Sequence, residues 1–273
     1  MSLQWDSPAA SVSPGAPGSP NDLDVYVFNA AGTQVVAGSI LDNINGDPIE
    51  VFSFVNNTGV TADFNIMITN FEGANPGFIK YVLFGFGGTI QEFATNSGTI
   101  YGHANANGAE AVGAAAYFQT PGFGVSPPVL EFYSSSGTTP VLFDLAGNPL
   151  PTPDPRADKP EIVAPDGVDT TFFGSFDIDR NGFPNFFGTS AAAPHAAAVA
   201  ALLLQARPDL TPTKLYRSLE NTAIDMGTPG FDNDTGFGFI QADKALLAAL
   251  KTRVADFDGD GKSDITVWNL VCD

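Results

Sequence analysis

The chain has 273 residues, of which 30 are acidic and only 11 are basic, so its formal net charge is −19. Such a charge repels nucleic acid and anionic membrane surfaces and attracts cations, so we expect no nucleic-acid partner. The length and the 44% hydrophobic content are sufficient to bury a core. The single cysteine, Cys272, is next to the last residue, so no internal disulfide can form.

Neither a membrane span nor a leader is indicated by the residue pattern. No run of about 18 or more apolar residues is free of polar interruption, so we expect no transmembrane helix. The first residues, Met1–Asp6, contain neither a basic region nor an apolar stretch, so we expect no signal peptide within this chain. A protein without disulfides can still function outside the cell if calcium and a large core supply its stability.

The first third of the chain is predicted to be all-β. Short β-prone runs are separated by clusters of Asn, Gly, Asp and Pro, which favour turns. Strands of this length and spacing indicate a small antiparallel β-sandwich or jelly roll, to which we assign residues 1–92. The β-prone runs are residues 23–28, 34–38, 49–55, 64–69 and 78–84.

The stretch from Ser190 to Gln205 is predicted to be a helix, because Ala and Leu, the strongest helix formers, fill most of it. It is apolar on every face, so we expect it to be buried on all sides, including at Ala197 and Ala198. A serine at the start of a buried helix lies where N–H groups and the helix dipole favour a developing negative charge. That position suits a nucleophile whose substrate becomes an oxyanion.

Residues 188–195 read Gly-Thr-Ser-Ala-Ala-Ala-Pro-His, which resembles the nucleophile motif of the subtilisin-like serine proteases, the subtilases. The resemblance implies that Ser190 is the acyl-forming nucleophile and that its own N–H is one oxyanion donor. It also implies that His195 supports the structure and is not the general base. The alternative is an ordinary serine that caps the helix, but the length of the matched motif favours the nucleophile.

Further segments resemble subtilase motifs in the same order along the chain. Together they cover about residues 98–250 and imply an α/β fold, a parallel sheet with helices on its faces. We assign residues 93–250 to the C-terminal half of such a catalytic domain, with the sandwich as an insertion. Asp166 stands where the family usually has glycine. The segments are residues 109–114, 132–137, 159–167 and 236–242.

A subtilase also needs a general base, an acid that orients it and a side-chain oxyanion donor. In the family the Asp and His precede the Ser, but His103 lies outside the usual His-Gly-Thr setting. The Asp-Thr-Gly at 234–236 comes after the serine, and Asn105 and Asn107 match the oxyanion Asn only by residue type.

We therefore interpret the chain as a segment of a longer secreted serine endopeptidase that acts on protein or peptide substrates. The missing groups would lie in an upstream half of the catalytic domain, so we expect the chain alone to be inactive. One alternative uses His103 as the base for Ser190. The other is a non-enzymatic extracellular adhesion or binding protein with a degenerate protease domain.

The last segment, residues 251–273, contains the pattern Asp-x-Asp-x-Asp-Gly that is typical of calcium-binding loops. It resembles the first loop of an FG-GAP or VCBS-type β-propeller repeat. A solvated acidic turn is the alternative interpretation. The predicted calcium ligands are Asp256, Asp258, Asp260 and Asp264.

Overall fold

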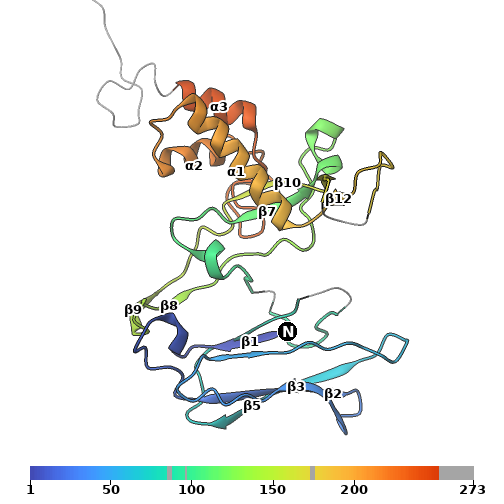
Figure 1. Cartoon of the computed structure of the whole chain (residues 1–273), viewed down its shortest axis with the longest axis vertical. Helices are drawn as coiled ribbons and strands as arrows, with labels where there is room; N and C mark the ends of the chain where they lie inside the picture. Colours follow the sequence, from blue (N-terminus) through green and yellow to red (C-terminus); the bar gives the residue numbers. More distant parts are fainter. Residues whose placement is uncertain (85–87, 96, 173–175, 252–273) are drawn as a thin grey trace, which may run out of the picture. The chain divides into compact units, whose positions relative to one another are not determined.

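The computed structural model describes residues 1–84, 88–95, 97–172 and 176–251. The chain forms two compact units (Figure 1). The first comprises residues 1–96 and 140–155, and the second comprises residues 97–139 and 156–273. The first unit is thus made of two separate stretches of sequence. The boundaries 1–92, 93–250 and 251–273 stay predictions from the sequence.

The first unit is built from antiparallel strands. One sheet has the strand order β4-β1-β6, the other has the order β3-β2-β5, and β8 pairs with β9 in a hairpin. All five β-prone runs overlap a strand, whereas β1 and the hairpin are additional. The bounds are β1 Ser2–Trp5, β2 Asp22–Asn29, β3 Val35–Ser39, β4 Ile49–Val51, β5 Phe64–Glu72, β6 Ile79–Val82, β8 Val141–Phe143 and β9 Pro149–Asp154, with a 3-10 helix at Ala10–Val12.

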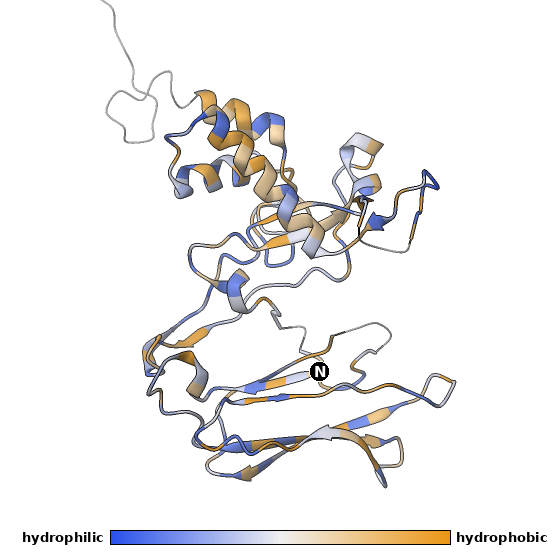
Figure 2. Ribbon diagram, in the orientation of Figure 1, coloured by the Kyte–Doolittle hydropathy of each residue, from blue (hydrophilic) through white to orange (hydrophobic). Residues whose placement is uncertain are grey.

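The core of the first unit joins its two sheets. Leu3 and Trp5 from β1 pack with Leu23 and Val25 from β2, and all four side chains are buried. Hydrophobic and hydrophilic residues alternate along β2 (Figure 2), as expected for a strand with one face in a core. The indole N–H of Trp5 donates to the side-chain oxygen of Asn21 at 2.7 Å, which satisfies the polar end of this buried ring.

The second unit has an α/β fold around a short parallel sheet, so the predicted α/β character is confirmed. Strands β7 and β10 pair in parallel, and β11 and β12 form a small antiparallel pair. The strands are β7 Val112–Ala116, β10 Ile162–Asp166, β11 Val168–Asp169 and β12 Asn185–Phe186. The helices are α1 Thr189–Ala206, α2 Pro212–Glu220 and α3 Ala242–Lys251, with 3-10 helices at Gly102–Asn105, Tyr117–Gln119 and Pro121–Phe123.

Helix α1 packs on β7 and β10 and contacts α2 and α3 (Figure 1). Its inner face contributes Ala192, Ala196 and Leu203 to the core of the second unit. The expectation that this helix is buried on all sides is wrong, because Ala197 and Ala198 are exposed. The reason is that the described strands and helices cover only one side of α1, so its opposite apolar face has no protein neighbour among them.

By length and composition alone, α1 is the one helix among the described residues that could cross a membrane. Its buried residues lie in a core with the parallel sheet, an arrangement that is also found for central helices of soluble α/β proteins. The expected absence of a membrane span stays a prediction.

Candidate active site

Ser190 lies in the first turn of α1, and its side chain is exposed. The residue that caps the helix is Gly188, whose carbonyl accepts the N–H groups of Ala191 at 2.8 Å and Ala192 at 3.2 Å. Ser190 is therefore not an N-cap serine. Within the described residues its hydroxyl has no hydrogen-bond partner, so it is accessible to a ligand.

One buried carboxylate joins the start of α1 to the end of β10. Asp166 is fully shielded from solvent, and its Oδ2 accepts the N–H of Gly188 at 2.7 Å. The same oxygen accepts the hydroxyl of Tyr133. Burial raises the pKa of the Tyr133 phenol far above its ordinary value, and the hydrogen bond to Asp166 adds to the increase. The phenol therefore stays protonated and donates its hydrogen.

Two glycines allow the backbone before Ser190 to run close to β10. Gly188 has a φ of 129°, which residues with a side chain rarely adopt. Gly167 has a φ of 71°, and a Cβ there would lie 2.5 Å from the Phe187 ring. The N–H of Gly167 also donates to the carbonyl of Phe186 at 2.8 Å. The segment that precedes Ser190 is thus held against the end of β10.

Asn185 of β12 is buried, with 2% of the residue exposed, and it links the residue before β11 to the loop between β11 and β12. Its Nδ2 donates to the carbonyl of Gly167 at 3.0 Å and to Asp169 Oδ1 at 3.1 Å. Its Oδ1 accepts the N–H of Ile178 at 2.8 Å. The sequence analysis did not identify this residue, because its partners become neighbours only after the chain folds back.

The turn at residues 177–182 reads Asp-x-Asp-x-Asn-Gly, a pattern that the sequence analysis also did not single out. The carboxylate of Asp177 accepts the N–H groups of Gly182 at 2.9 Å and Asn181 at 3.0 Å, and the Gly182 bond contributes most to lowering its pKa. Asn181 Nδ2 donates to Asp169 at 2.7 Å and to Asp179 at 3.0 Å. Across the described ranges, no group of three or more His, Cys, Asp or Glu is placed to hold a metal ion.

The two histidines have different surroundings. The Nδ1 of His195 lies 2.8 Å from the carbonyl of Ala191, one helical turn earlier, so this nitrogen carries the proton and ties the ring to its own helix. This contact fits the structural role that the resemblance implies. His103 is exposed on the 3-10 helix at Gly102–Asn105. Among the described residues neither ring makes a hydrogen bond to Ser190.

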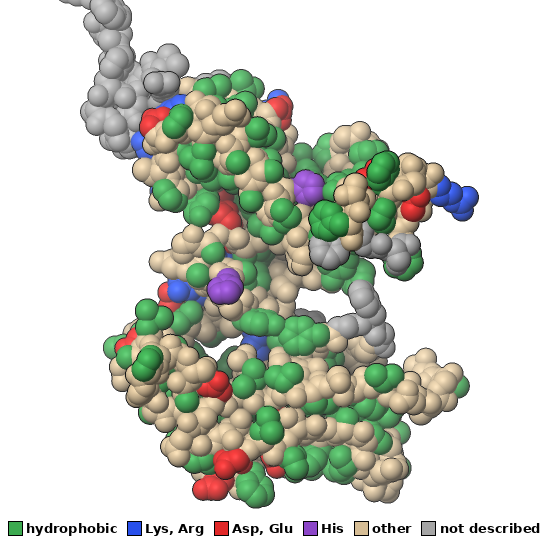
Figure 3. Space-filling model, viewed as in Figure 1, with side chains coloured by type: hydrophobic (Ala, Val, Ile, Leu, Met, Phe, Trp, Pro, Cys, Tyr) green, Lys and Arg blue, Asp and Glu red, His purple; other side chains and the backbone are tan. Residues whose placement is uncertain are grey.

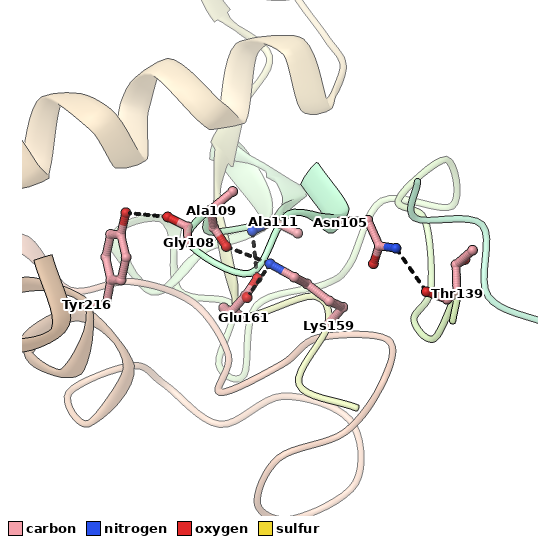
Figure 4. A network of polar contacts seen from close by, with 8 residues as sticks. All are labelled: Asn105, Gly108, Ala109, Ala111, Thr139, Lys159, Glu161 and Tyr216. Atoms are coloured by element: carbon pink, nitrogen blue, oxygen red, sulfur yellow. Dashed lines mark hydrogen bonds and ion pairs between the residues drawn. The ribbon is translucent and has the colours of Figure 1, made fainter. Parts of the chain in front are cut away.

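The other candidate partners of the serine are also used elsewhere. Asn105 is buried, and its Nδ2 donates to the carbonyl of Thr139 at 2.8 Å (Figure 4). Asp234 accepts the hydroxyl of Ser136 at 2.6 Å. The structure therefore brings neither of them to Ser190. The predicted calcium ligands Asp256, Asp258, Asp260 and Asp264 lie outside the described residues.

A buried ionic network lies where β7 and β10 begin (Figure 4). The Nζ of Lys159 lies 2.5 Å from Glu161 Oε1 and donates to the carbonyl of Ala109 at 2.5 Å. Glu161 Oε2 accepts the N–H of Ala111 at 2.6 Å. Burial raises the pKa of nearby Glu110 to about 8, and the charge of Glu161 adds to the increase. The network fixes the two strands at the end opposite to Asp166.

The family model of the Subtilase family matches residues 88–238, which are more than half of the chain. The chain belongs to the subtilase family. Fervidolysin from Fervidobacterium pennivorans is 47% identical over 66 residues, which are 24% of this chain and 9% of fervidolysin. The extracellular serine protease of Serratia marcescens is 38% identical over 65 residues, which are 24% of this chain and 6% of that protease.

Among solved structures, that of fervidolysin, described as a keratinolytic enzyme related to subtilisin, aligns with 27% identity and a TM-score of 0.37. The alignment covers 53% of this chain and 20% of fervidolysin. This subtilase chain thus matches less than a tenth of the length of either curated relative. The family match also covers the whole path from β7 through β10 to Ser190.

Proposed function

We propose that this chain supplies the nucleophile-bearing part of a serine endopeptidase and that Ser190 forms the acyl-enzyme. The observation that supports this most directly is the exposed position of Ser190 in the first turn of α1, within the subtilase motif. N–H groups at the start of a helix favour the negative charge that develops on a carbonyl oxygen under attack. Protein or peptide substrates follow from this reaction, and the name of the Serratia relative supports an extracellular site of action.

The general base, the acid that orients it and the oxyanion Asn are proposed to come from an upstream half of the catalytic domain in a parent chain. Two structural features support this origin. Parallel sheets are ordinarily covered on both faces and contain several strands, whereas β7 and β10 form a sheet of two within the part of the chain that the structure describes. The outer face of α1 is also open, and hydrophobic side chains reach the surface around this helix (Figure 3).

The chain alone is then expected to be inactive. A serine hydroxyl is a weak nucleophile near neutral pH until a positioned base takes its proton. Because the members of a catalytic triad act as a unit, the loss of the base alone removes nearly all of the rate gain. The N–H of Ser190 is left as the oxyanion donor without its Asn partner, and one such donor contributes about 100- to 1000-fold.

Two further parts of the proposal concern the rest of the chain. The first unit is proposed to be a jelly-roll-like β-sandwich inserted in the protease, which its two sheets with a joint core support. Residues 251–273 are proposed to begin a repeat in which Asp256, Asp258, Asp260 and Asp264 bind calcium. The alternating carboxylates of the sequence support this site.

A fluorophosphonate probe tests the assignment of Ser190. We expect no labelling of the chain alone, and stoichiometric labelling when the upstream half of the catalytic domain is added. The control Ser190→Ala should abolish that labelling. Labelling of the chain alone that disappears in His103→Ala would instead identify His103 as the base. A complete parent protein that neither labels nor cleaves unfolded casein would favour the adhesion or binding protein.

A further inference from the structure

We propose that Asp166 is a positioning residue for the nucleophile: its buried carboxylate, held by Tyr133, fixes the amide of Gly188 and thereby the first turn of α1. The inference rests on the proposed function, because the placement of Ser190 matters for catalysis only if Ser190 reacts. The subtilase motif does not assign this role, since the resemblance places a glycine where this chain has Asp166.

The carboxylate of Asp166 lies at the end of a rigid strand, β10. Asp166 is the last residue of β10 and pairs with Ala116 of β7 in the parallel sheet. The three residues at the start of β10, from Ile162 to Ala164, are fully buried. A side chain at the end of such a strand has few alternative positions, so it offers an acceptor that is fixed relative to the core.

The amide of Gly188 depends on this acceptor. Glycine has no side chain, and no side chain caps the N-terminus of α1 from the N-cap position. Asp166 supplies from another strand an acceptor for the N–H of the N-cap residue, which a Glu or Gln at the third helical position accepts in a capping box. Its hydrogen bond to the Gly188 N–H is 2.7 Å long, at the short end of the range for N–H···O bonds. If this hydrogen bond were lost, the backbone of Gly188, which glycine restricts little, would be free to vary two positions before the nucleophile.

Tyr133 keeps the carboxylate in place from the other side. Its ring packs against the core cluster that includes Ala192 and Ala196 of α1, and its hydroxyl donates to Asp166 Oδ2. Among the described residues, Asp166 Oδ1 has no hydrogen-bond partner. The orientation of the carboxylate therefore depends on the two groups that meet at Oδ2, the Tyr133 hydroxyl and the Gly188 N–H.

The charge of the carboxylate acts in the same direction as its geometry. A negative group near the start of a helix is stabilised by the free N–H groups and the dipole of that helix. Asp166 meets this condition through Gly188, the N-cap of α1. The hydrogen bond from the Gly188 N–H to Asp166, which we call the anchor, thus strengthens the first helical turn and leaves the hydroxyl of Ser190 exposed.

Amide hydrogen exchange of this chain, measured by NMR, tests the anchor and requires no catalytic activity. In Asp166→Ala we expect the Gly188 amide to exchange about 10- to 100-fold faster, the effect of losing a hydrogen bond to a charged group. The amide of Ala164 in β10 should keep its rate. Asp232→Ala is the matched control, because the Asp232 carboxylate accepts the backbone N–H groups of Thr228, Asp234 and Thr235, which all lie outside α1.

Two milder variants separate positioning from folding. Tyr133→Phe removes only the hydroxyl, so it should accelerate Gly188 exchange less than Asp166→Ala while the chain stays folded. Asp166→Asn keeps an oxygen that can accept the Gly188 N–H, so it should recover part of the protection. If Asp166→Ala does not fold, these two variants still decide the question, and unchanged Gly188 exchange in both would overturn the proposal.

Activity is then measured in a protein that contains the upstream half. Misplacing a nucleophile costs up to about 100-fold in rate, so Asp166→Ala should lower kcat about 10- to 100-fold and leave KM within about 2-fold. Asp166→Asn should restore part of kcat. An inert wild-type protein would contradict the proposed function alone, because Gly188 exchange still reports on the anchor. Full activity of Asp166→Ala, with unaltered KM, would contradict the positioning role.

Discussion

The ammonium group of Lys159 lies 2.5 Å from the carboxylate of Glu161, and the two side chains are only 4% and 11% exposed. Removal of either partner from such a pair destabilises the folded chain, because the other charge is left buried without compensation. The pair lies where β7 and β10 begin, so its loss affects the strands that carry the nucleophile-bearing helix.

Replacement of Lys159 should therefore be strongly destabilising. We expect Lys159→Met to lower the free energy of unfolding by about 3–5 kcal/mol, as measured by urea denaturation. The matched control is Lys244→Met, since Lys244 forms an exposed pair with Asp243 at 3.4 Å. That change should stay within about 0.5 kcal/mol. Equal effects of the two replacements would contradict the importance of the buried pair.

Stability should also decrease as pH rises through the neutral range. Burial raises the pKa of Glu110 from 4.5 to about 8 in the folded chain. A carboxyl group with a raised folded-state pKa contributes stability that is complete below its unfolded pKa and is lost as pH rises through its folded pKa. The free energy of unfolding should therefore fall between about pH 4.5 and 8. Glu110→Gln should flatten this decrease, and an unchanged slope would show that Glu110 is not its source.

The two faces of α1 should respond differently to larger side chains. Ala192 and Ala196 are buried and Ala198 is exposed. In this chain, Ala192→Leu or Ala196→Leu should cost about 1–3 kcal/mol through overpacking, whereas Ala198→Leu should leave the melting temperature nearly unchanged. In a protein with the upstream half, Ala198→Leu should become destabilising. A neutral Ala198→Leu in both proteins would argue against coverage of this face.

Close packing at Gly167 should be visible as a steric cost beyond that of its backbone conformation. A Cβ at Gly167 would lie 2.5 Å from the Phe187 ring, whereas one at Gly182, which also has a positive φ, meets nothing within 4 Å. Gly167→Ala should therefore destabilise by about 1–3 kcal/mol more than Gly182→Ala, measured by thermal unfolding. Phe187→Leu should reduce the difference, and similar losses in both variants would mean that the ring moves aside freely.

Calcium should bind the final segment weakly in this chain. The proposed ligands are the carboxylates of Asp256, Asp258, Asp260 and Asp264, and isolated extracellular modules bind calcium in about the millimolar range. Titration calorimetry with calcium should show heat that is lost in Asp258→Asn and is absent with magnesium. On a protein with several repeats, calcium should also raise the melting temperature. If that protein showed neither binding heat nor a higher melting temperature with calcium, the proposed site would be wrong.

Local composition was sufficient to predict the elements with a strong internal signal. The helix expected at 190–205 is observed at Thr189–Ala206, because Ala and Leu favour helices in almost any surroundings. The exposure of Ala197 and Ala198 could not be predicted in the same way. An apolar face indicates that a partner is needed, but the sequence of the helix does not say whether the folded chain provides one.

The candidate site was predictable only in part. The serine motif is contiguous, so Ser190 could be identified from eight neighbouring residues. The anchor at Asp166 joins residues that lie 22 positions apart, and Tyr133 is 33 positions from Asp166. In the sequence, Asp166 was visible only as an unusual residue in a familiar motif. Contacts of this range depend on how the strands and the helix come together, which local pattern does not encode.

The hairpin β8–β9 belongs to the first unit although its residues, 140–155, interrupt the sequence of the second. Its turn is held there by close packing, since a Cβ at Gly147 would lie 3.3 Å from Pro17. The chain therefore crosses between the units three times, near residues 96, 139 and 155. A single chain break cannot separate the two units, and a deletion of the first 96 residues would remove the rest of the unit to which the hairpin belongs. Dissection of this protein needs a short replacement linker from Thr139 to Arg156.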